Sequence, residues 1–171
     1  SSAASDVYKR QIRSCNEIIE ILNNATFDAA KVKSQIAEAK FLRAWMYLDM
    51  AKRYGGVPLE LTPKSVDAPM DELMIPRNTL KETYDQIISD LDAASTDLPG
   101  VVLYGKASKW AAFALKSRAA LYAARIAKYH PQSSNGLTSI PSVDAAAYYT
   151  KSLQAAKAVI DGGKHPLYKG G

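Results

Sequence analysis

Two copies of one arginine motif are the strongest candidates for side-chain chemistry in this sequence. The pattern Arg-Ala-x-x-Tyr occurs at 43–47 and again at 118–122, each time near the edge of an apolar helical stripe. A guanidinium group in such a position is seldom left without a partner. We predict that Arg118 pairs with an acid of the preceding helix, foremost Asp90, the alternative being plain exposure of Arg118. The residues that we expect to have structural roles are Arg43, Tyr47, Tyr54, Asp90, Arg118 and Tyr122.

The residue spacing gives little support to catalysis or metal binding. Asp90 and Asp92 fall on different faces of a helix, which excludes them as a preorganised acid–base pair. His130 and His165 each stand alone, without the i, i+4 partner or nearby cysteines of a metal site. No Gly-x-Ser-x-Gly nucleophile pattern occurs. We therefore expect a protein that binds and is not an enzyme, with no metal and no cofactor.

Composition indicates a globular domain. The 171 residues are 47% hydrophobic and 23% charged, and no apolar run approaches the ~20 residues that a membrane-spanning helix needs. The single cysteine, Cys15, excludes an intrachain disulfide and lies in an apolar stretch, which favours a buried thiol. The net charge of +5 is uneven, because the stretch 55–100 is acidic and the stretch after it is basic. We interpret the basic half as a solvated helix surface rather than a nucleic-acid site.

The elements that must position these residues are helices. Apolar residues recur at steps of three and four, and strand-like alternation is nearly absent. Capping and stop signals predict helices around 12–25, from Asp28 to Tyr54, from Thr79 to about Leu98, from Ser108 to Tyr129, and from Ser142 to Gly162. Long proline-bearing loops are expected at 55–78 and 130–142.

Comparison of the helices predicts the fold class. The second and fourth helices share one internal register, as do the third and fifth, so the unit is a short helix followed by a longer one. We predict an all-α fold of TPR-like antiparallel helix pairs, an α-α superhelix with long loops. The pairs are 12–54 and 79–129, and the last helix, lacking a mate, should expose an apolar face. Residues 1–11 look like a non-native, adapter-derived tail, and 12–171 like a partial TPR-like domain truncated within a repeat.

Four segments together resemble the SusD/RagB family of nutrient-binding lipoproteins. They are Ala37-Glu38-Ala39-Lys40-Phe41-Leu42-Arg43-Ala44-Trp45-Met46-Tyr47 running on to Arg53-Tyr54-Gly55-Gly56-Val57-Pro58-Leu59, Arg77-x-Thr79-x-x-Glu82-x-Tyr84-x-x-Ile87-x-x-Asp90-Leu91, Gly105-Lys106-Ala107-Ser108-Lys109-Trp110, and Tyr149-x-x-Ser152-Leu153-x-Ala155-Ala156. The family more often has Gly-Arg where this chain has Gly105-Lys106. The resemblance covers nearly everything after residue 12.

This resemblance implies the N-terminal TPR-like part of a surface-exposed protein of a Gram-negative outer membrane. Such a protein captures oligosaccharides or peptides and hands them to a SusC-like TonB-dependent transporter. Its membrane attachment would be only through a lipid anchor, which this chain does not contain. In the loop after Tyr54, which the resemblance associates with ligand, Glu60, Thr62 and Lys64 are the candidate contacts, although solvated loop residues are the alternative. Tyr104 is a further candidate as an exposed aromatic residue.

Two other classes of binding protein remain open. A TPR-like adaptor would bind protein segments in its concave groove, but adaptors usually keep tight turns where this chain has long loops. Nucleic-acid binding by the basic half would need aromatic platforms among its lysines, and these are missing.

Overall fold

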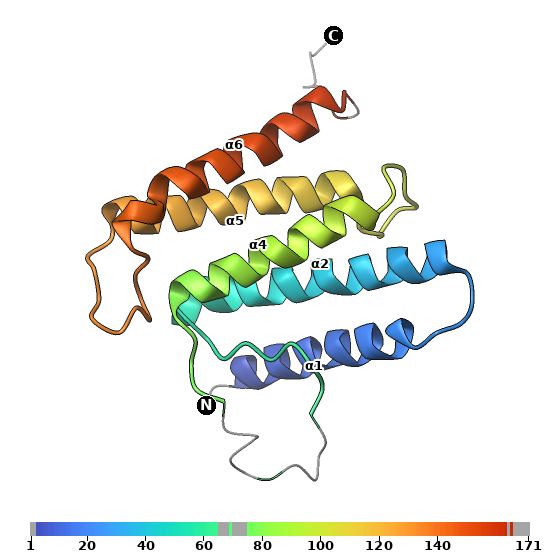
Figure 1. The fold of residues 1–171 in the computed structure, drawn as a ribbon, viewed down its shortest axis with the longest axis horizontal. Coiled ribbons are helices and arrows are strands. Elements are labelled where there is room, and N and C mark those ends of the chain that lie inside the picture. The colour runs from blue at the N-terminus through green and yellow to red at the C-terminus, as the bar shows by residue number, and fades with distance from the viewer. Residues whose placement is uncertain (1–2, 65–68, 70–74, 164, 166–171) are drawn as a thin grey trace.

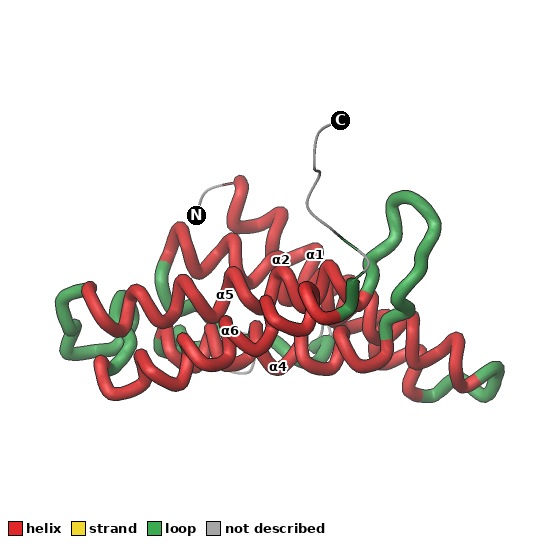
Figure 2. The backbone as a smooth tube through the Cα atoms, turned by 90° about the horizontal axis from the view of Figure 1, so that it is seen from above, coloured by secondary structure: helices red, strands yellow, loops and turns green. Residues whose placement is uncertain are grey.

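The computed structural model describes residues 3–64, 69, 75–163 and 165, and this part of the chain is helical, without a strand. Its elements are α1 (Ala3–Asn23), α2 (Ala29–Tyr54), α4 (Leu80–Asp97), α5 (Lys109–Tyr129), the short 3₁₀ helix η1 (Ser142–Asp144) and α6 (Ala145–Asp161). The helices stack side by side in chain order, with α1 at one edge and α6 at the other (Figure 1). The view from above shows that loops join the ends of these helices (Figure 2). The predicted all-α, TPR-like architecture is confirmed.

Local sequence signals explain where three of these helices begin. The Asp28 side chain accepts hydrogen bonds from the backbone N–H groups of Ala30 and Lys31 at the start of α2. Thr79 and Glu82 form a reciprocal capping box at α4, as predicted. Ser108 accepts from a backbone N–H in the first turn of α5. Each cap satisfies N–H groups that the first helical turn leaves without an intrahelical acceptor.

The predicted cap at Ser142 is wrong. Ser142 lies within η1, where the Asp144 N–H donates to the Pro141 carbonyl at 3.0 Å, and α6 begins only at Ala145. No side-chain capping bond forms at the start of α6. Because the 3₁₀ turn already supplies a short backbone bond next to the proline, the chain enters α6 without a side-chain cap.

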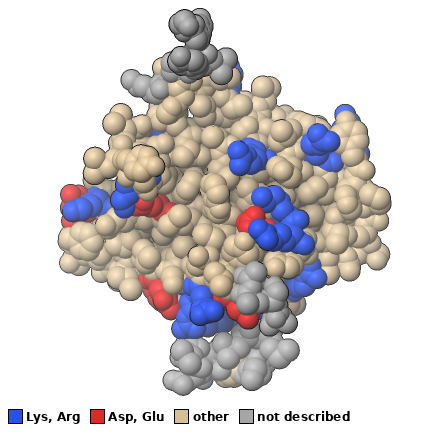
Figure 3. Space-filling model, turned by 180° about the vertical axis from the view of Figure 1, so that it is seen from behind, with Lys and Arg blue, Asp and Glu red and all other residues tan. Residues whose placement is uncertain are grey.

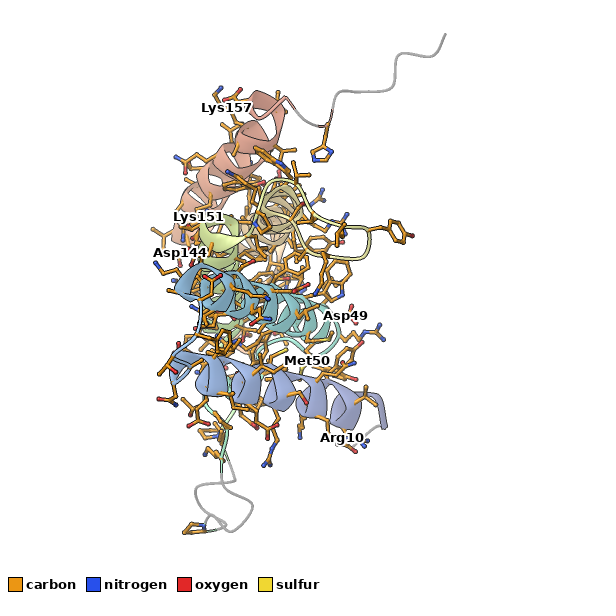
Figure 4. The ribbon with its side chains drawn as sticks, turned by 90° about the vertical axis from the view of Figure 1, so that its right-hand side faces the viewer. Arg10, Asp49, Met50, Asp144, Lys151 and Lys157 are labelled. Carbon is orange, nitrogen blue, oxygen red and sulfur yellow. The ribbon has the colours of Figure 1, made fainter. Side chains whose placement is uncertain are left out.

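Helix α1 includes most of the stretch that we set apart as a tail. It begins at Ala3, and Ile12 is buried in the core. The Tyr8 hydroxyl donates a hydrogen bond to the Asp49 carboxylate, and Met50, on the side of α2 toward α1, is buried as well (Figure 4). The α1–α2 contact therefore includes residues from both sides of position 11.

Small residues allow the central helices to approach closely. Ala44, Ala94, Ala112 and Ala119 are all fully buried. Larger side chains fill the remaining space, the most buried being Tyr47, Tyr84, Ile87, Leu91, Ile140 and Tyr148. These small residues at the helix contacts place the core between α2, α4 and α5.

A glycine pair ends α2 and joins two loops that are far apart in sequence. Gly55 has a φ of 77°, a conformation that favours glycine, and a Cβ there would lie 2.3 Å from the Leu137 carbonyl oxygen. The Gly56 N–H donates to that oxygen at 2.7 Å, and the Leu80 N–H donates to the Gly136 carbonyl at 2.9 Å. The loop after α5 is thus bonded to both ends of the loop after α2. We call these two hydrogen bonds the loop junction.

Helix α6 packs on α5 and also reaches α4. The Tyr148 hydroxyl donates to Asp85 of α4 at 2.7 Å, and the Ser152 hydroxyl donates to the Ser117 carbonyl of α5 at 2.9 Å. On the other side of α6, Leu153 is 68% exposed and Ile160 is 76% exposed. The predicted exposed apolar face on this helix is confirmed. None of the helices in the described ranges is long and apolar enough to cross a membrane.

Candidate functional site

The most buried charged group in the described part of the chain is an arginine–aspartate pair between α2 and α4. Arg43 makes two parallel hydrogen bonds to Asp90, Nε to Oδ2 at 2.8 Å and Nη2 to Oδ1 at 2.7 Å. The two residues are only 5% and 3% exposed. The remaining Arg43 nitrogen, Nη1, donates to the Asn16 side chain of α1 at 2.7 Å and to the Leu61 carbonyl at 3.2 Å. One guanidinium group therefore connects three elements and a loop.

This pair keeps its charges inside the protein. Burial acts to lower the pKa of Arg43, but the hydrogen bonds and the negative charge of Asp90 raise that pKa above its ordinary value. The nearby Cys15 is buried, as predicted, and burial raises the pKa of its thiol. An arginine that stays charged with its hydrogen bonds satisfied positions its neighbours; it does not transfer protons.

The first part of the loop after α2, residues 55–64, is held against the helices by its backbone. The Tyr47 hydroxyl donates to the Glu60 carbonyl at 2.9 Å and accepts from the Glu60 N–H at 2.8 Å. Asn16 donates to the same carbonyl at 2.8 Å. The Leu59 N–H donates to the Asn78 side chain at 3.1 Å. Buried side chains of α1 and α2, together with Asn78, thus hold the backbone of this segment in place.

The candidate ligand residues lie on this fixed loop. Thr62 is exposed, whereas Glu60 and Lys64 are half-buried. The hydrogen bonds from Asn16 and Tyr47 involve the backbone of Glu60 and not its carboxylate. The loop carries no aromatic side chain, and the aromatic candidate Tyr104 is fully exposed on a different loop, between α4 and α5.

The predicted pairing of Arg118 with Asp90 is wrong. Asp90 is occupied by Arg43, and Arg118 is exposed on α5. The two arginines share a local motif, but only Arg43 lies on the helix face that meets α4 under the cover of α1. Tyr122, expected beside Arg118, is 46% exposed, while its counterpart Tyr47 is 1% exposed.

A groove opens where the end of α2 and the C-terminal half of α5 meet over the start of α4. It has a volume of about 550 Å³. Its lining comprises Ala51, Lys52, Arg53, Tyr54, Gly55, Leu80, Tyr84, Tyr122, Ile126, His130 and Thr138. A second hollow of about 500 Å³ along α5 shares Tyr122, Ile126 and His130 with it and adds Leu121, Arg125 and Tyr129. We call the two together the α2–α5 groove.

Sequence reasoning missed two of the residues that organise these regions. Asn16 lies in an apolar stripe, and a polar residue at a buried position was the available signal for its role. Tyr84 falls at the helical spacing of buried apolar residues, which agrees with its buried ring, but its hydroxyl has no hydrogen-bond partner in the described part of the chain. Nothing local in the sequence distinguishes a bonded from an unbonded tyrosine hydroxyl.

The charges on the face seen from behind do not gather into one basic patch (Figure 3). From behind, lysines and arginines form separate clusters, several of them next to acids, on a surface that is mostly uncharged (Figure 3). Among the described residues, no group of three or more histidines, cysteines or acids is placed to hold a metal ion.

Comparison with known proteins identifies the family. The model of the SusD-like family, described as starch-binding and associating with the outer membrane, matches residues 4–121. A search of curated proteins finds no match. Among solved structures, a SusD-like protein from Bacteroides fragilis is 30% identical, with a TM-score of 0.73 over 93% of this chain and 27% of that one.

Two further structures share the fold at lower identity. One, solved with a xylogluco-oligosaccharide, is 22% identical with a TM-score of 0.77, and the match covers 96% of this chain and 30% of that one. A laminarin-binding SusD-like protein is 23% identical with a TM-score of 0.64, covering 85% of this chain and 28% of that one. The chain thus spans roughly three-tenths of the length of these solved proteins. With a family model matching more than half of its residues, the chain belongs to the SusD-like family, as the sequence motifs indicated.

Proposed function

We propose that this chain is the helical scaffold of a surface protein that captures oligosaccharides and delivers them to a SusC-like TonB-dependent transporter. The observation that carries the proposal is the family match over residues 4–121. The solved relatives with a xylogluco-oligosaccharide and with laminarin binding support sugars over peptides as ligands. Location at the outer-membrane surface, with attachment through a lipid anchor, belongs to the same proposal.

The loop after α2 supplies one ligand-contacting surface in this proposal. Its backbone is fixed from within by Tyr47 and Arg43, so binding there would cost little ordering of the main chain. Thr62 would donate and accept hydrogen bonds with sugar hydroxyls, and the charged groups of Glu60 and Lys64 would fix the orientation of the sugar.

Calorimetric titration of the full chain with neutral and acidic oligosaccharides tests the capture step. We expect measurable binding of at least one sugar, and a loss of roughly tenfold in affinity when Thr62 and Lys64 are both changed to alanine. The variant Val143→Ala, at an exposed position before α6, serves as a matched control and should bind as the unchanged chain does. Failure of every sugar to bind would overturn capture by this chain.

Delivery needs a separate measurement. The tagged protein should co-purify from outer membranes with a TonB-dependent transporter. Deletion of its gene should slow the uptake of the sugar by the cell. Recovery of the protein without any transporter, under conditions where sugar binding is retained, would contradict the delivery step alone.

A further inference from the structure

The α2–α5 groove has the features of a ligand site that is distinct from the loop after α2. We infer that it binds an acidic sugar, a hexuronate-containing oligosaccharide, through the Tyr84 hydroxyl at its floor, the Tyr122 ring at its wall and cationic side chains at its rim. This inference rests on the proposed capture of oligosaccharides and adds to it a site and a chemical class.

The floor of the groove contains an unused hydrogen-bonding group. Tyr84 is 0% exposed and lines the groove, and its hydroxyl has no hydrogen-bond partner among the described residues. Buried polar groups are nearly always bonded, and an exception calls for an explanation. Burial raises the pKa of Tyr84, so the hydroxyl remains protonated and able to donate. The hydroxyl lies beneath the surface of the groove, so a ligand oxygen would satisfy this donor once the lining side chains move aside.

Partly exposed aromatic side chains line the groove and the adjoining hollow. Tyr122 is 46% exposed and Tyr54 is 38% exposed, and both line the groove. Tyr129, which lines the adjoining hollow, is 66% exposed. Half-exposed aromatic rings next to hydrogen-bonding groups provide apolar contact for one face of a sugar ring while its hydroxyls stay solvated.

The charge at the rim selects an acidic ligand. Lys52 and Arg53 line the groove, Arg125 lines the adjoining hollow, and no carboxylate appears in either described lining. Asp49 contacts Lys52 at 3.3 Å and Arg53 at 3.2 Å, but it lies outside the lining. A sugar carboxylate would therefore meet cations on several sides, and bonds between ionised partners are the stronger ones.

The size of the groove fits more than one sugar unit. Its two parts, of about 550 and 500 Å³, adjoin along Tyr122, Ile126 and His130. Ligand pockets in proteins commonly have volumes of roughly 300–1,000 Å³. The test ligand should accordingly be a trisaccharide, with a neutral sugar of the same length for comparison.

Titration calorimetry with tri-galacturonate and with neutral galactotriose tests the inference. We expect the full chain to bind the acidic sugar at least about tenfold more tightly, and the difference to shrink at high salt. Tyr84→Phe and Tyr122→Ala should each weaken acidic-sugar binding about tenfold. The matched control Phe27→Ala removes an exposed aromatic side chain before the start of α2, at the opposite end of that helix from the groove, and should leave the affinity unchanged.

The outcomes separate this inference from the proposed function. Binding of the acidic sugar that neither groove variant weakens would overturn the site, while capture would stand. Tighter binding of the neutral sugar would overturn the chemical class, again with capture intact. If the chain bound no oligosaccharide of any kind, the proposed function would fail together with the inference. Tyr122 is half-exposed, so the Tyr122→Ala result remains decisive even if Tyr84→Phe failed to fold.

Discussion

Helices α2 and α5 carry the same Arg-Ala-x-x-Tyr pattern in opposite environments. In α2, Arg43 is 5% exposed and Tyr47 is 1% exposed, and both bond to other elements. In α5, Arg118 is exposed and Tyr122 is 46% exposed. The difference lies in what covers each helix. Both helices pack between two others, but the loop after α2 also closes over α2 and bonds to Arg43 and Tyr47. The loop after α5 instead bonds to Gly56 and Leu80, at the two ends of the loop after α2.

The comparison shows how one motif can serve two purposes. Both copies place a small alanine where neighbouring helices approach, and Ala44 and Ala119 are both 0% exposed. The arginine and tyrosine around that alanine become structural only where a third element closes over them. On α5 no loop closes over them, although α6 packs on the helix, and the tyrosine lines the α2–α5 groove.

The largest expected difference in the free energy of unfolding is between a variant that unpairs Arg43 and a variant that removes Arg118. Asp90→Ala would leave the buried Arg43 charge without its carboxylate, and we expect it to lower the free energy of unfolding by about 3–5 kcal/mol. Arg118→Ala changes an exposed side chain and should cost less than about 0.5 kcal/mol. Urea unfolding of both variants, followed by circular dichroism, measures the gap. Equal midpoints for the two variants would remove the basis of the comparison.

The next largest difference in the free energy of unfolding is expected between two buried tyrosines, Tyr47 and Tyr84, when each is changed to phenylalanine. Tyr47→Phe leaves the Glu60 N–H without the hydroxyl it bonds, and it should lower the free energy of unfolding by about 1–3 kcal/mol. Tyr84→Phe removes a hydroxyl that has no partner, so its effect should be about zero or slightly stabilising. The same urea titration decides between them. A large loss of stability in Tyr84→Phe would mean that its hydroxyl is bonded in solution.

A smaller effect concerns pH and the cover that α1 gives to α2. The hydrogen bond from Tyr8, followed by the neighbouring Lys52 and Arg53, lowers the pKa of Asp49 below its ordinary value of 3.8. A lowered pKa means that the contribution of Asp49 is fully present above pH 3.8 and is lost as the pH falls through the lower value in the folded state. The protection factors of the α1 amides, which compare exchange with the intrinsic rate at each pH, should therefore fall below that pH. Asp49→Asn should abolish this pH dependence, and α5, which has Ala124 at the matching position, should show no such change.

The smallest effect concerns the apolar face at the open edge of the stack. Leu153→Lys alters a side chain that is 68% exposed and should change the free energy of unfolding by less than about 0.5 kcal/mol. Binding of a hydrophobic dye should fall in this variant, because part of the exposed apolar patch is removed. Leu91→Ala, at a fully buried position in α4, should instead cost about 2–5 kcal/mol. Dye binding that stays constant in Leu153→Lys would assign the dye to another surface.

The helices and most of their beginnings could be predicted because they depend on local sequence. The capping box at Thr79 and the cap at Ser108 involve residues within one turn of each other. The partner of Asp90 could not be predicted in this way, since the choice between Arg43 and Arg118 depends on which helix face α1 covers. At Ser142 the local signal itself was overridden by a backbone turn after Pro141.

The candidate sites, too, could be predicted from the sequence only in part. The loop after α2 could be located from its prolines and glycines, but its attachment through Asn16 and Tyr47 joins positions more than 12 residues apart. The α2–α5 groove requires three helices to meet, and its floor depends on a tyrosine hydroxyl that no helix partner reaches. Periodicity predicts which residues face inward, and it does not predict the spaces left between the elements.

The loop junction has a consequence for the order in which the protein folds. Helix-to-helix contacts here follow the chain from α1 to α6, so each can form soon after its neighbours. The bonds from Gly56 to Leu137 and from Leu80 to Gly136 instead need α4 and α5 to be in place before the loops can meet. Contacts between distant positions carry the larger loop-closure entropy and slow folding. The Gly56 amide should accordingly gain protection from exchange in the last step of refolding, after the amides within α4 and α5.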